Sequence, residues 1–358
     1  MQKTEIAIIG RVAKGTALCD GQTQKTRELQ DALQKAFPLA HIRCVDTYKY
    51  SRHVLPILWQ TLCAFAACPH IFVLLSRNGR TFFFPLITAL NKIFKRQLYH
   101  DVIGGALPTE AAERPALQKQ LRRFCVNWVE TPEMKAQLEA LGVDNAEVLP
   151  NFKQLEIAAP DAVRMWADHA GPFVFATFSR VLREKGIGEA AAAVAAANRI
   201  RGKKCAVLRI YGPIEDAYRT EFDALLREYA DCVTYEGCIP SKESGRVLGD
   251  CFMLLFPTTY RGEGMPGTLI DAYAVGLPVI ASDWHFNASF VEDGVTGWIY
   301  PADKPECLSE RVLYAVEHPG EVDGMRMACL ERARCYLPEA AMKTVAAKMR
   351  EQNPKVGS

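Results

Sequence analysis

Apolar runs of strand length alternate along the chain with longer segments of helical period. The strand-length runs lie at residues 6–9, 42–45, 71–75, 97–102, 128–130, 147–149, 173–178, 206–211, 233–235, 253–256 and 279–281. The helical segments lie at residues 25–37, 55–67, 82–94, 115–124, 132–141, 186–200, 216–230, 242–249 and 267–275. This alternation predicts an α/β fold, because a helix between two strands returns the chain to a parallel sheet. We expect two Rossmann-like doubly wound domains, at residues 1–155 and 170–335.

The composition fits two ordinary folded domains. The chain has 358 residues, of which 49% are hydrophobic, and its 43 basic side chains nearly balance 41 acidic ones. These values exclude a disordered or collagen-like protein. The twelve cysteines contain no CxxC pair, and the first residues lack the apolar run of a signal peptide. We therefore expect reduced thiols and a cytoplasmic location.

Residues 54–75 contain no Lys, Arg, Asp or Glu, and a segment of this length can span a bilayer. Pro56, Pro69 and His70 argue against a single membrane helix. We favour the alternative, a buried helix at residues 55–67 followed by a buried strand at residues 71–75.

Basic side chains concentrate in the first half of the chain. Residues 1–150 have a net charge of +6, from 19 Lys and Arg against 13 Asp and Glu. Near the aromatic run at residues 82–84 the sequence has Arg77, Arg80, Lys92, Lys95, Arg96, Arg122 and Arg123. Two interpretations are open: a solvated helix face, or an apolar surface edged with positive charge that contacts an anionic membrane. The signatures of nucleic-acid binding are absent, so we expect no nucleic-acid partner.

Residues 257–282 predict a strand, a glycine-rich loop, a helix and a strand. The amides of Gly267, Thr268 and Leu269 open the helix, and a helix N-terminus favours a phosphate group. Glu263 lies in the loop, and Asp271 follows eight positions later, so both carboxylates can point to one side of the helix. Each carboxylate offers two acceptor oxygens for neighbouring sugar hydroxyls. The alternative is a loop charge and a solvated helix residue.

This segment resembles the E-x7-E region of retaining GT-B glycosyltransferases, particularly glycosyltransferase family 4 (glycosyl transferases group 1). The run Gly-Leu-Pro-Val-Ile-Ala-Ser at residues 276–282, typical of that family, completes the likeness. Asp271 stands where the family usually has a second Glu, which keeps the charge and shortens the reach. The resemblance implies that Glu263 contacts the donor sugar and that Asp271 holds the ribose.

A second motif, at residues 178–187, resembles the Gly-Arg-Leu-x-x-x-Lys-Gly segment of the same family. Arg180 and Lys185 match its two basic positions. A nucleoside diphosphate gains negative charge as the sugar bond breaks, and two fixed cations would stabilise that charge. For this motif alone, a surface Arg and Lys at a turn is the alternative. Ile239 follows an aromatic-x-Gly sequence, and the resemblance makes it a candidate contact to the donor base.

Several residues of the first half are candidates for the same ligand. Gly21 and Thr23 precede the first helical segment, where they would face the donor phosphates with Lys25 as a further cation. An N-cap turn at Thr23 is the alternative. His100 stands near a position where family members often have a His that contacts the transferred sugar. A structural role for His100 is equally open, with Asp101 as the substitute candidate.

The resemblance covers nearly the whole chain and implies the GT-B fold, in which two Rossmann-like domains face an interdomain cleft. It also implies that a C-terminal helix at residues 338–352 crosses back to the first domain. The implied enzyme moves a hexose-type sugar from a UDP- or GDP-sugar to an acceptor hydroxyl with retention of configuration, without a metal or a covalent nucleophile. No His, Cys or carboxylate cluster in the sequence has metal-ligand spacing.

The basic first half adds an expectation about the acceptor. We expect a saccharide or lipid-linked saccharide of bacterial capsule, exopolysaccharide or lipopolysaccharide biosynthesis, met at the inner face of the plasma membrane. Two other functions are open: a GT-B nucleotide-sugar epimerase, and a catalytically silent GT-B module that binds sugar nucleotides. Glu263, Arg180 and Lys185 favour an enzyme, because a binding module needs no paired cations at a leaving group.

Overall fold

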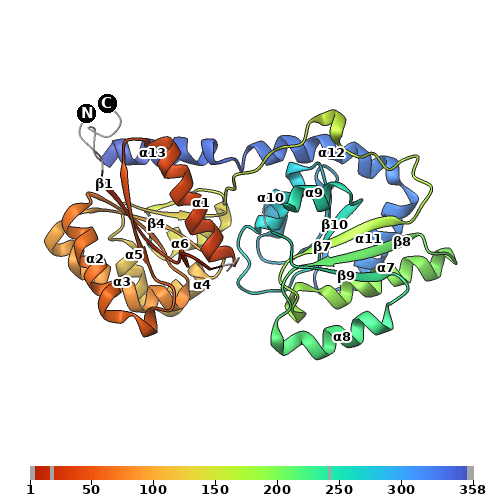
Figure 1. Cartoon of the computed structure of the whole chain (residues 1–358), viewed down its shortest axis with the longest axis horizontal. Coiled ribbons are helices and arrows are strands. Elements are labelled where there is room, and N and C mark those ends of the chain that lie inside the picture. The colour runs from red at the N-terminus through yellow and green to blue at the C-terminus, as the bar shows by residue number, and fades with distance from the viewer. Residues whose placement is uncertain (1–4, 17–19, 241–242, 353–358) are drawn as a thin grey trace. The chain divides into compact units, whose positions relative to one another are not determined.

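The computed structural model describes residues 5–16, 20–240 and 243–352 (Figure 1). The chain divides into two units, an N-terminal unit and a C-terminal unit. The N-terminal unit consists of Met1–Gln154, Gly262–Met265 and Tyr336–Ser358. The C-terminal unit consists of Leu155–Arg261 and Pro266–Cys335. A four-residue loop and the last helix therefore pack with residues that are far away in the sequence.

The N-terminal unit is built on one six-stranded parallel sheet. The strand order β2-β1-β3-β4-β5-β6 means that the chain winds outward from β1 in both directions, as in a doubly wound fold. Its elements are β1 (Glu5–Gly10), α1 (Gly21–Ala36), β2 (His41–Asp46), α2 (Val54–Ala67), β3 (His70–Leu74), α3 (Arg77–Phe94), β4 (Gln97–Asp101), α4 (Leu107–Glu113), α5 (Pro115–Leu121), β5 (Val126–Val129), α6 (Pro132–Ala140), β6 (Ala146–Val148) and α13 (Pro338–Gln352).

Helices α1 and α13 pack together in this unit, as Figure 1 shows. Leu33 of α1 and Val345 of α13 join one buried cluster with three aromatic residues of neighbouring strands. The ring centres of Phe72 and Tyr99 lie 4.8 Å apart, and those of Tyr99 and Trp128 lie 5.7 Å apart. These stacked rings bury a large apolar area and tie β3, β4 and β5 to the last helix.

The C-terminal unit has a second six-stranded parallel sheet, with the order β12-β11-β10-β7-β8-β9. Its strands are flanked by helices in the same alternating manner (Figure 1). Its elements are β7 (Phe173–Phe178), η3 (Arg183–Lys185), α7 (Ile187–Arg201), β8 (Ala206–Tyr211), α8 (Arg219–Glu228), β9 (Val233–Gly237), α9 (Ser244–Gly249), β10 (Met253–Phe256), α10 (Gly267–Ala274), β11 (Val279–Asp283), β12 (Gly297–Pro301), α11 (Glu306–Glu317) and α12 (Pro319–Arg334).

Every apolar run predicted as a strand coincides with a strand of the structure. The sequence pattern did not predict α4, β12, α11 or α12. Helix α12 illustrates why: its buried face includes the charged residues Asp323 and Arg326, while the apolar Met327 is exposed, so the apolar period is weak in the sequence. Helix α3 begins at Arg77, five residues before the predicted start at residue 82, because the polar first turn hides the helical period.

The prediction that the helix at residues 55–67 is buried is wrong in one respect. Helix α2 buries Ile57 and Phe65, but Leu55 is 78% exposed, Trp59 66% and Leu62 37%. We call these last three residues the α2 apolar face. Within the described ranges, none of the helices combines the length and apolar character that a membrane crossing needs.

The basic and aromatic residues near positions 82–84 do not form one surface. Phe83 and Phe84 are fully buried, whereas Phe82 is 40% exposed. Arg80 is also buried, and its guanidinium donates hydrogen bonds to Glu110 Oε1 and to the Leu75 carbonyl, each at 2.8 Å. Part of the predicted charged surface is therefore core, where a buried Arg is retained because it is paired.

Candidate functional site

The carboxyl edge of the C-terminal sheet holds three loops together through backbone hydrogen bonds. The Ser179 amide donates to the Tyr211 carbonyl (3.1 Å), and the Gly212 amide donates to the Gly237 carbonyl (2.9 Å). The Tyr235 hydroxyl donates to the Gly212 carbonyl at 2.8 Å. These contacts join the segments that follow β7, β8 and β9, so the loop that carries the first predicted cation has a fixed path.

The two cations predicted to hold a diphosphate approach one aromatic ring. The guanidinium carbon of Arg180 lies 5.4 Å from the centre of the Tyr260 ring, and Nζ of Lys185 lies 5.1 Å from it. Lys185 Nζ is also 5.7 Å from the ring centre of Phe256. Arg180 is exposed, while Lys185 is 9% exposed. The structure therefore brings the two predicted cations together, in a place where aromatic faces support positive charge.

Gly186 sets the close approach between the Lys185 turn and the loop after β10. It has a φ of +70°, and a Cβ atom at this position would lie 2.3 Å from the Pro257 carbonyl oxygen. The Thr259 amide donates to the Glu184 carbonyl at 2.7 Å, which closes the same contact. Only glycine fits this backbone conformation at this distance. The backbone geometry thus explains why the second motif has a glycine directly after Lys185.

The N-terminus of α10 offers only part of the set of backbone amides that was predicted to bind a phosphate. Helix α10 begins at Gly267, and the first amides of a helix lack partners within the helix. The Leu269 amide, however, donates to the Pro266 carbonyl at 3.1 Å, so it is already used, and Leu269 is fully buried. The Thr268 hydroxyl is a buried polar atom without a hydrogen-bond partner among the residues that the structure describes. A phosphate oxygen placed there would satisfy it.

Asp271 and Ile239 are placed differently from what a ribose and base contact suggests. Asp271 is 3% exposed, and its Oδ1 accepts a hydrogen bond from the Ser244 hydroxyl of α9 at 3.0 Å. Helix α10 begins at Gly267, so Glu263 lies in the loop before the helix, as predicted. Ile239, two residues beyond β9, is half-buried. Their contacts with a nucleoside remain predictions.

In the N-terminal unit, Thr23 belongs to a helix cap. Asp20 is the N-cap of α1, and it accepts hydrogen bonds from the Thr23 amide at 3.2 Å and the Thr23 hydroxyl at 3.0 Å. Arg11 forms an ion pair with the same carboxylate. Thr23 is fully buried, which favours the capping alternative, whereas Gly21 is exposed in the first turn. Of the two residues predicted to face the donor phosphates here, Gly21 is exposed and Thr23 is buried.

The expectation that Lys25 is a further cation for phosphate is wrong. Its side chain is 5% exposed, with Nζ 2.9 Å from Asp101 Oδ1 and 2.8 Å from Glu130 Oε1. Nζ also donates to the Val102 carbonyl at 2.6 Å. Burial opposes the charge on Lys25, but Asp101 and Glu130 outweigh burial and raise its pKa. Burial likewise raises the pKa of Asp101, against the effect of Lys25.

The structure does not support a sugar contact for His100. This side chain has no exposed surface, and its ring centre lies 5.0 Å from that of Phe84 and 5.3 Å from that of Phe124. Its Nδ1 is 2.9 Å from Asn127 Oδ1. Burial, followed by the charge of Arg80, lowers the pKa of His100 to about 3, so the imidazole is neutral. The structural alternative for His100 fits these contacts.

Glu263 lies in the loop Gly262–Met265, which packs with the N-terminal unit. The Met265 amide donates to Glu130 Oε2 at 2.7 Å, and Asn151 Nδ2 donates to the Met265 carbonyl at 3.3 Å. A Cβ at Gly264 would lie 2.0 Å from the same oxygen of Glu130, so a larger residue there would displace this carboxylate. Glu130 was not predicted, although a carboxylate directly after the buried strand β5 was a signal.

Comparison with known proteins gives a family for part of the chain. Residues 172–318 match the model of the family described as "Glycosyl transferases group 1". The amylovoran biosynthesis glycosyltransferase AmsK of Erwinia amylovora is 28% identical over 167 residues, which are 46% of this chain and 40% of that protein. The putative colanic acid biosynthesis glycosyltransferase WcaL of Escherichia coli K12 is 27% identical over 51% of this chain and 42% of that protein. The matches thus span about two fifths of each relative.

Solved structures extend the likeness to both units. The structure of Anabaena HepE in complex with UDP and glucose superposes with a TM-score of 0.76 at 14% identity, and covers 97% of this chain and 100% of that one. The sucrose-phosphate synthase of Thermosynechococcus elongatus gives a TM-score of 0.75 at 19% identity, over 98% and 99% of the chains. Together with the two parallel sheets, this likeness confirms the predicted GT-B fold of two Rossmann-like units.

Proposed function

We propose, from the premise that residues 172–318 belong to the glycosyl transferases group 1 family, that this chain is a glycosyltransferase of polysaccharide biosynthesis. In this proposal it moves a hexose-type sugar from a nucleotide-sugar donor to an acceptor hydroxyl and retains the anomeric configuration. The observation that carries the proposal is the approach of Arg180 and Lys185 to the single Tyr260 ring. Two cations held at one place suit the diphosphate of a departing nucleotide.

Sugar transfer requires stabilisation of the negative charge that develops on the leaving diphosphate. As the bond between the sugar and the diphosphate breaks, its electrons pass to the phosphate oxygen, and Arg180 and Lys185 stabilise that charge. The N-terminus of α10 and the Thr268 hydroxyl supply further donors for phosphate oxygens. The acceptor oxygen forms the new bond on the same face of the sugar, and its proton passes to the leaving phosphate. Glu263 contacts the donor sugar in this proposal.

A thermal-shift screen tests the donor. HepE binds UDP, so we screen UDP-sugars together with GDP-sugars. One of them is expected to raise the Tm of the wild type, because a ligand at 100 times its Kd stabilises a folded protein by about 2.7 kcal/mol. Lys185→Ala is expected to abolish the rise, whereas Arg183→Gln, which removes an exposed charge of the same turn, should retain it. A wild type without any shift contradicts the donor site.

Product analysis separates the proposed reaction from its alternatives. The expected product is a new glycoside with the anomeric configuration of the donor, read by NMR. An isomerised donor would identify an epimerase, and an unchanged donor that binds would identify a silent module. Activity is expected to survive EDTA, since the proposal routes no step through a metal.

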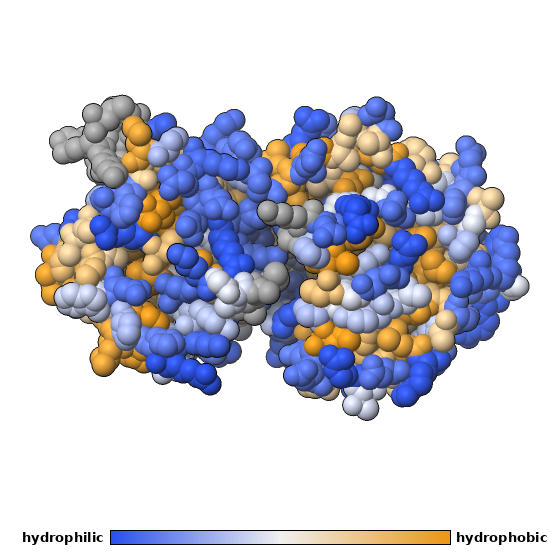
Figure 2. All heavy atoms as spheres, in the orientation of Figure 1, coloured by the Kyte–Doolittle hydropathy of each residue, from blue (hydrophilic) through white to orange (hydrophobic). Residues whose placement is uncertain are grey.

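We extend the proposal to an acceptor at a membrane. AmsK and WcaL are named for polysaccharide biosynthesis, which fits a saccharide or lipid-linked saccharide acceptor at the cytoplasmic face of the plasma membrane. The α2 apolar face supports this, together with Ile93 of the neighbouring α3, which is 75% exposed. Lys92 and Lys95 lie beside Ile93. Figure 2 shows apolar side chains on the part of the surface where Figure 1 places α2 and α3. Exposed Trp and Leu beside Lys are typical of membrane-surface helices.

Flotation with anionic liposomes at low salt tests the membrane contact. The wild type is expected to float, and Leu55→Gln/Trp59→Gln is expected to lower the partition coefficient at least about tenfold, because each side chain contributes about 1.5–3 kcal/mol when buried. Ile200→Gln is the control, since Ile200 is 65% exposed in the C-terminal unit and should not change flotation. A wild type that does not associate at low salt excludes this part of the proposal.

A further inference from the structure

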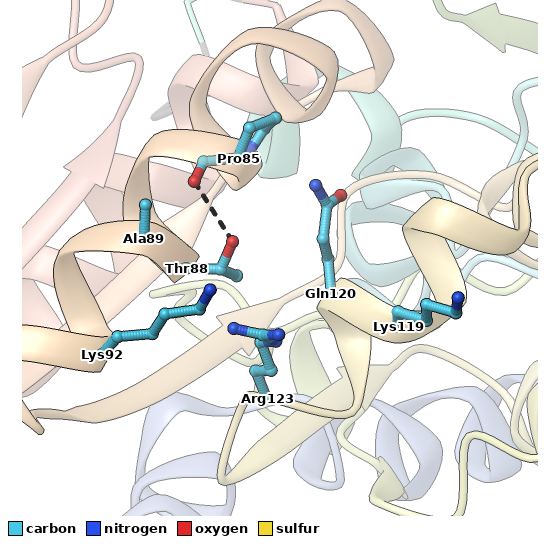
Figure 3. Close-up of a pocket in the computed structure, with 7 residues that line it drawn as sticks. All are labelled: Pro85, Thr88, Ala89, Lys92, Lys119, Gln120 and Arg123. Atoms are coloured by element: carbon cyan, nitrogen blue, oxygen red, sulfur yellow. Dashed lines mark hydrogen bonds between the residues drawn. The ribbon is translucent and has the colours of Figure 1, made fainter.

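A pocket of about 200 Å³ lies between α3 and α5 in the N-terminal unit (Figure 3). Its lining comes from α3, from α5 and from the turn after α5, and consists of Pro85, Thr88, Ala89, Lys92, Lys119, Gln120 and Arg123. A water molecule occupies about 30 Å³ of liquid, so the pocket has room for a group of several atoms.

The lining of this pocket is positively charged and contains no acidic residue. Lys92, Lys119 and Arg123 are all exposed, and none of them forms an ion pair with another residue of the described ranges. Figure 3 shows the charged ends of Lys92 and Arg123 pointing toward one another, although they come from different elements. The two positive charges repel each other, so an anion between Lys92 and Arg123 would be stabilised by both.

The donor groups match the oxygens of a phosphate. Arg123 offers a planar fork of N–H groups and Lys92 offers an ammonium, the two side chains that bind phosphate most often in proteins. The Gln120 amide points into the space above them (Figure 3). The Thr88 hydroxyl is already used, since it donates to the Phe84 carbonyl at 2.7 Å. The pocket therefore offers charged and neutral donors and no competing carboxylate.

Helix dipoles explain only part of this arrangement. Lys92 lies in the last turn of α3 and Lys119 in the last turn of α5, where a positive side chain stabilises the helix end. That effect is independent for each helix, and it does not favour bringing Lys92 and Arg123 toward each other. A shared anion does favour it.

The pocket does not belong to the edge of the sheet where α/β proteins usually bind substrates. Lys92 lies just before β4 and Arg123 just before β5, so both residues lie near the amino ends of these strands. Open parallel sheets bind ligands at the carboxyl ends of their strands. The inference below therefore holds whether or not the proposed transferase activity is correct.

We propose that this pocket binds a phosphate group through Lys92, Arg123 and Gln120, with Lys119 at its rim. The phosphate is either the headgroup of an anionic lipid or a soluble phosphate, because both present the same charged oxygens. A bound phosphate offsets the repulsion between the two converging cations. Salt screens the attraction between these cations and the phosphate, so the affinity is expected to fall as ionic strength rises.

Acetylation of individual lysines, read by mass spectrometry on the full chain, tests the proposal. The ligand probes are pyrophosphate and, separately, vesicles that contain phosphatidic acid. When the probe concentration is ten times the Kd, about 90% of the pockets are occupied, so acetylation of Lys92 is expected to slow about tenfold. Lys203 and Lys204, exposed in the C-terminal unit, are the internal controls and should react at an unchanged rate. Protection by pyrophosphate assigns a soluble phosphate, and protection by vesicles alone assigns a lipid headgroup.

Arg123→Gln completes the test, because it keeps both lysines as reporters. It is expected to abolish the protection of Lys92 in whichever arm showed it. Arg77→Gln is the charge-matched control, since Arg77 is an exposed residue at the other end of α3 and outside the pocket. An unprotected Lys92 in both arms, or full protection that survives Arg123→Gln, overturns the proposal. The thermal-shift screen with UDP- and GDP-sugars reports the donor site separately.

Discussion

Replacing Lys185 with alanine is expected to lower kcat by about 10²–10³-fold, the loss typical of removing one group that stabilises transition-state charge. Lys185 is 9% exposed and lies near the rings of Tyr260 and Phe256, so bulk water and salt screen its charge poorly. The effect should appear in kcat as well as in donor binding, because the diphosphate is already charged in the bound donor and gains further charge during bond cleavage. Release of nucleoside diphosphate from the donor found by thermal shift measures the rate.

Arg183→Gln is the matched control for this prediction. Arg183 belongs to the same short helical turn, but its side chain is 73% exposed and pairs with Glu221 at the surface. Surface pairs of this kind contribute little to stability, so the variant should keep both its rate and its Tm. An equal loss of rate in both variants would mean that the turn matters through its shape and that the Lys185 charge does not.

Gly186→Ala is expected to lower the free energy of unfolding of the C-terminal unit by about 2–5 kcal/mol. Two costs add: about 1–2 kcal/mol for a side chain in the left-handed backbone region, and about 1–3 kcal/mol for overpacking. The new Cβ would lie 2.3 Å from the Pro257 carbonyl oxygen, so the Lys185 turn and the loop after β10 must separate. Activity is expected to fall as well, because Tyr260 follows in that loop. Hydrogen exchange of the α7 amides measures the stability of this unit alone.

Gly188→Ala controls for the addition of a methyl group to the same helix. A Cβ at Gly188 would lie 3.7 Å from Leu225, an ordinary contact, in a helical conformation. This variant is expected to stabilise the unit by about 0.5–1 kcal/mol, because alanine loses less backbone entropy than glycine on folding. Equal exchange rates in the two variants would contradict the role of Gly186 in the close approach.

The candidate site was predictable where a motif acts through its own backbone. Arg180, Lys185 and Gly186 lie in one continuous segment between β7 and α7, and the contact with the loop after β10 keeps the two cations near one ring. Residues that act through distant partners were not predictable. Glu130 holds the loop that contains Glu263, but its partner, the Met265 amide, lies 135 positions away in the sequence.

Most of the strands and helices and the class of fold were predictable, because the period of apolar residues is a local property of the chain. Which polar residues are available to a ligand depends on the packing of distant parts of the chain. Lys25 and His100 look like site residues in the sequence, yet one is enclosed by two carboxylates and the other by two aromatic rings. Helix α2 looks buried in the sequence, yet the α2 apolar face is open. The burial of a side chain depends on its contacts with residues that are distant in the sequence, and a local sequence pattern does not contain this information.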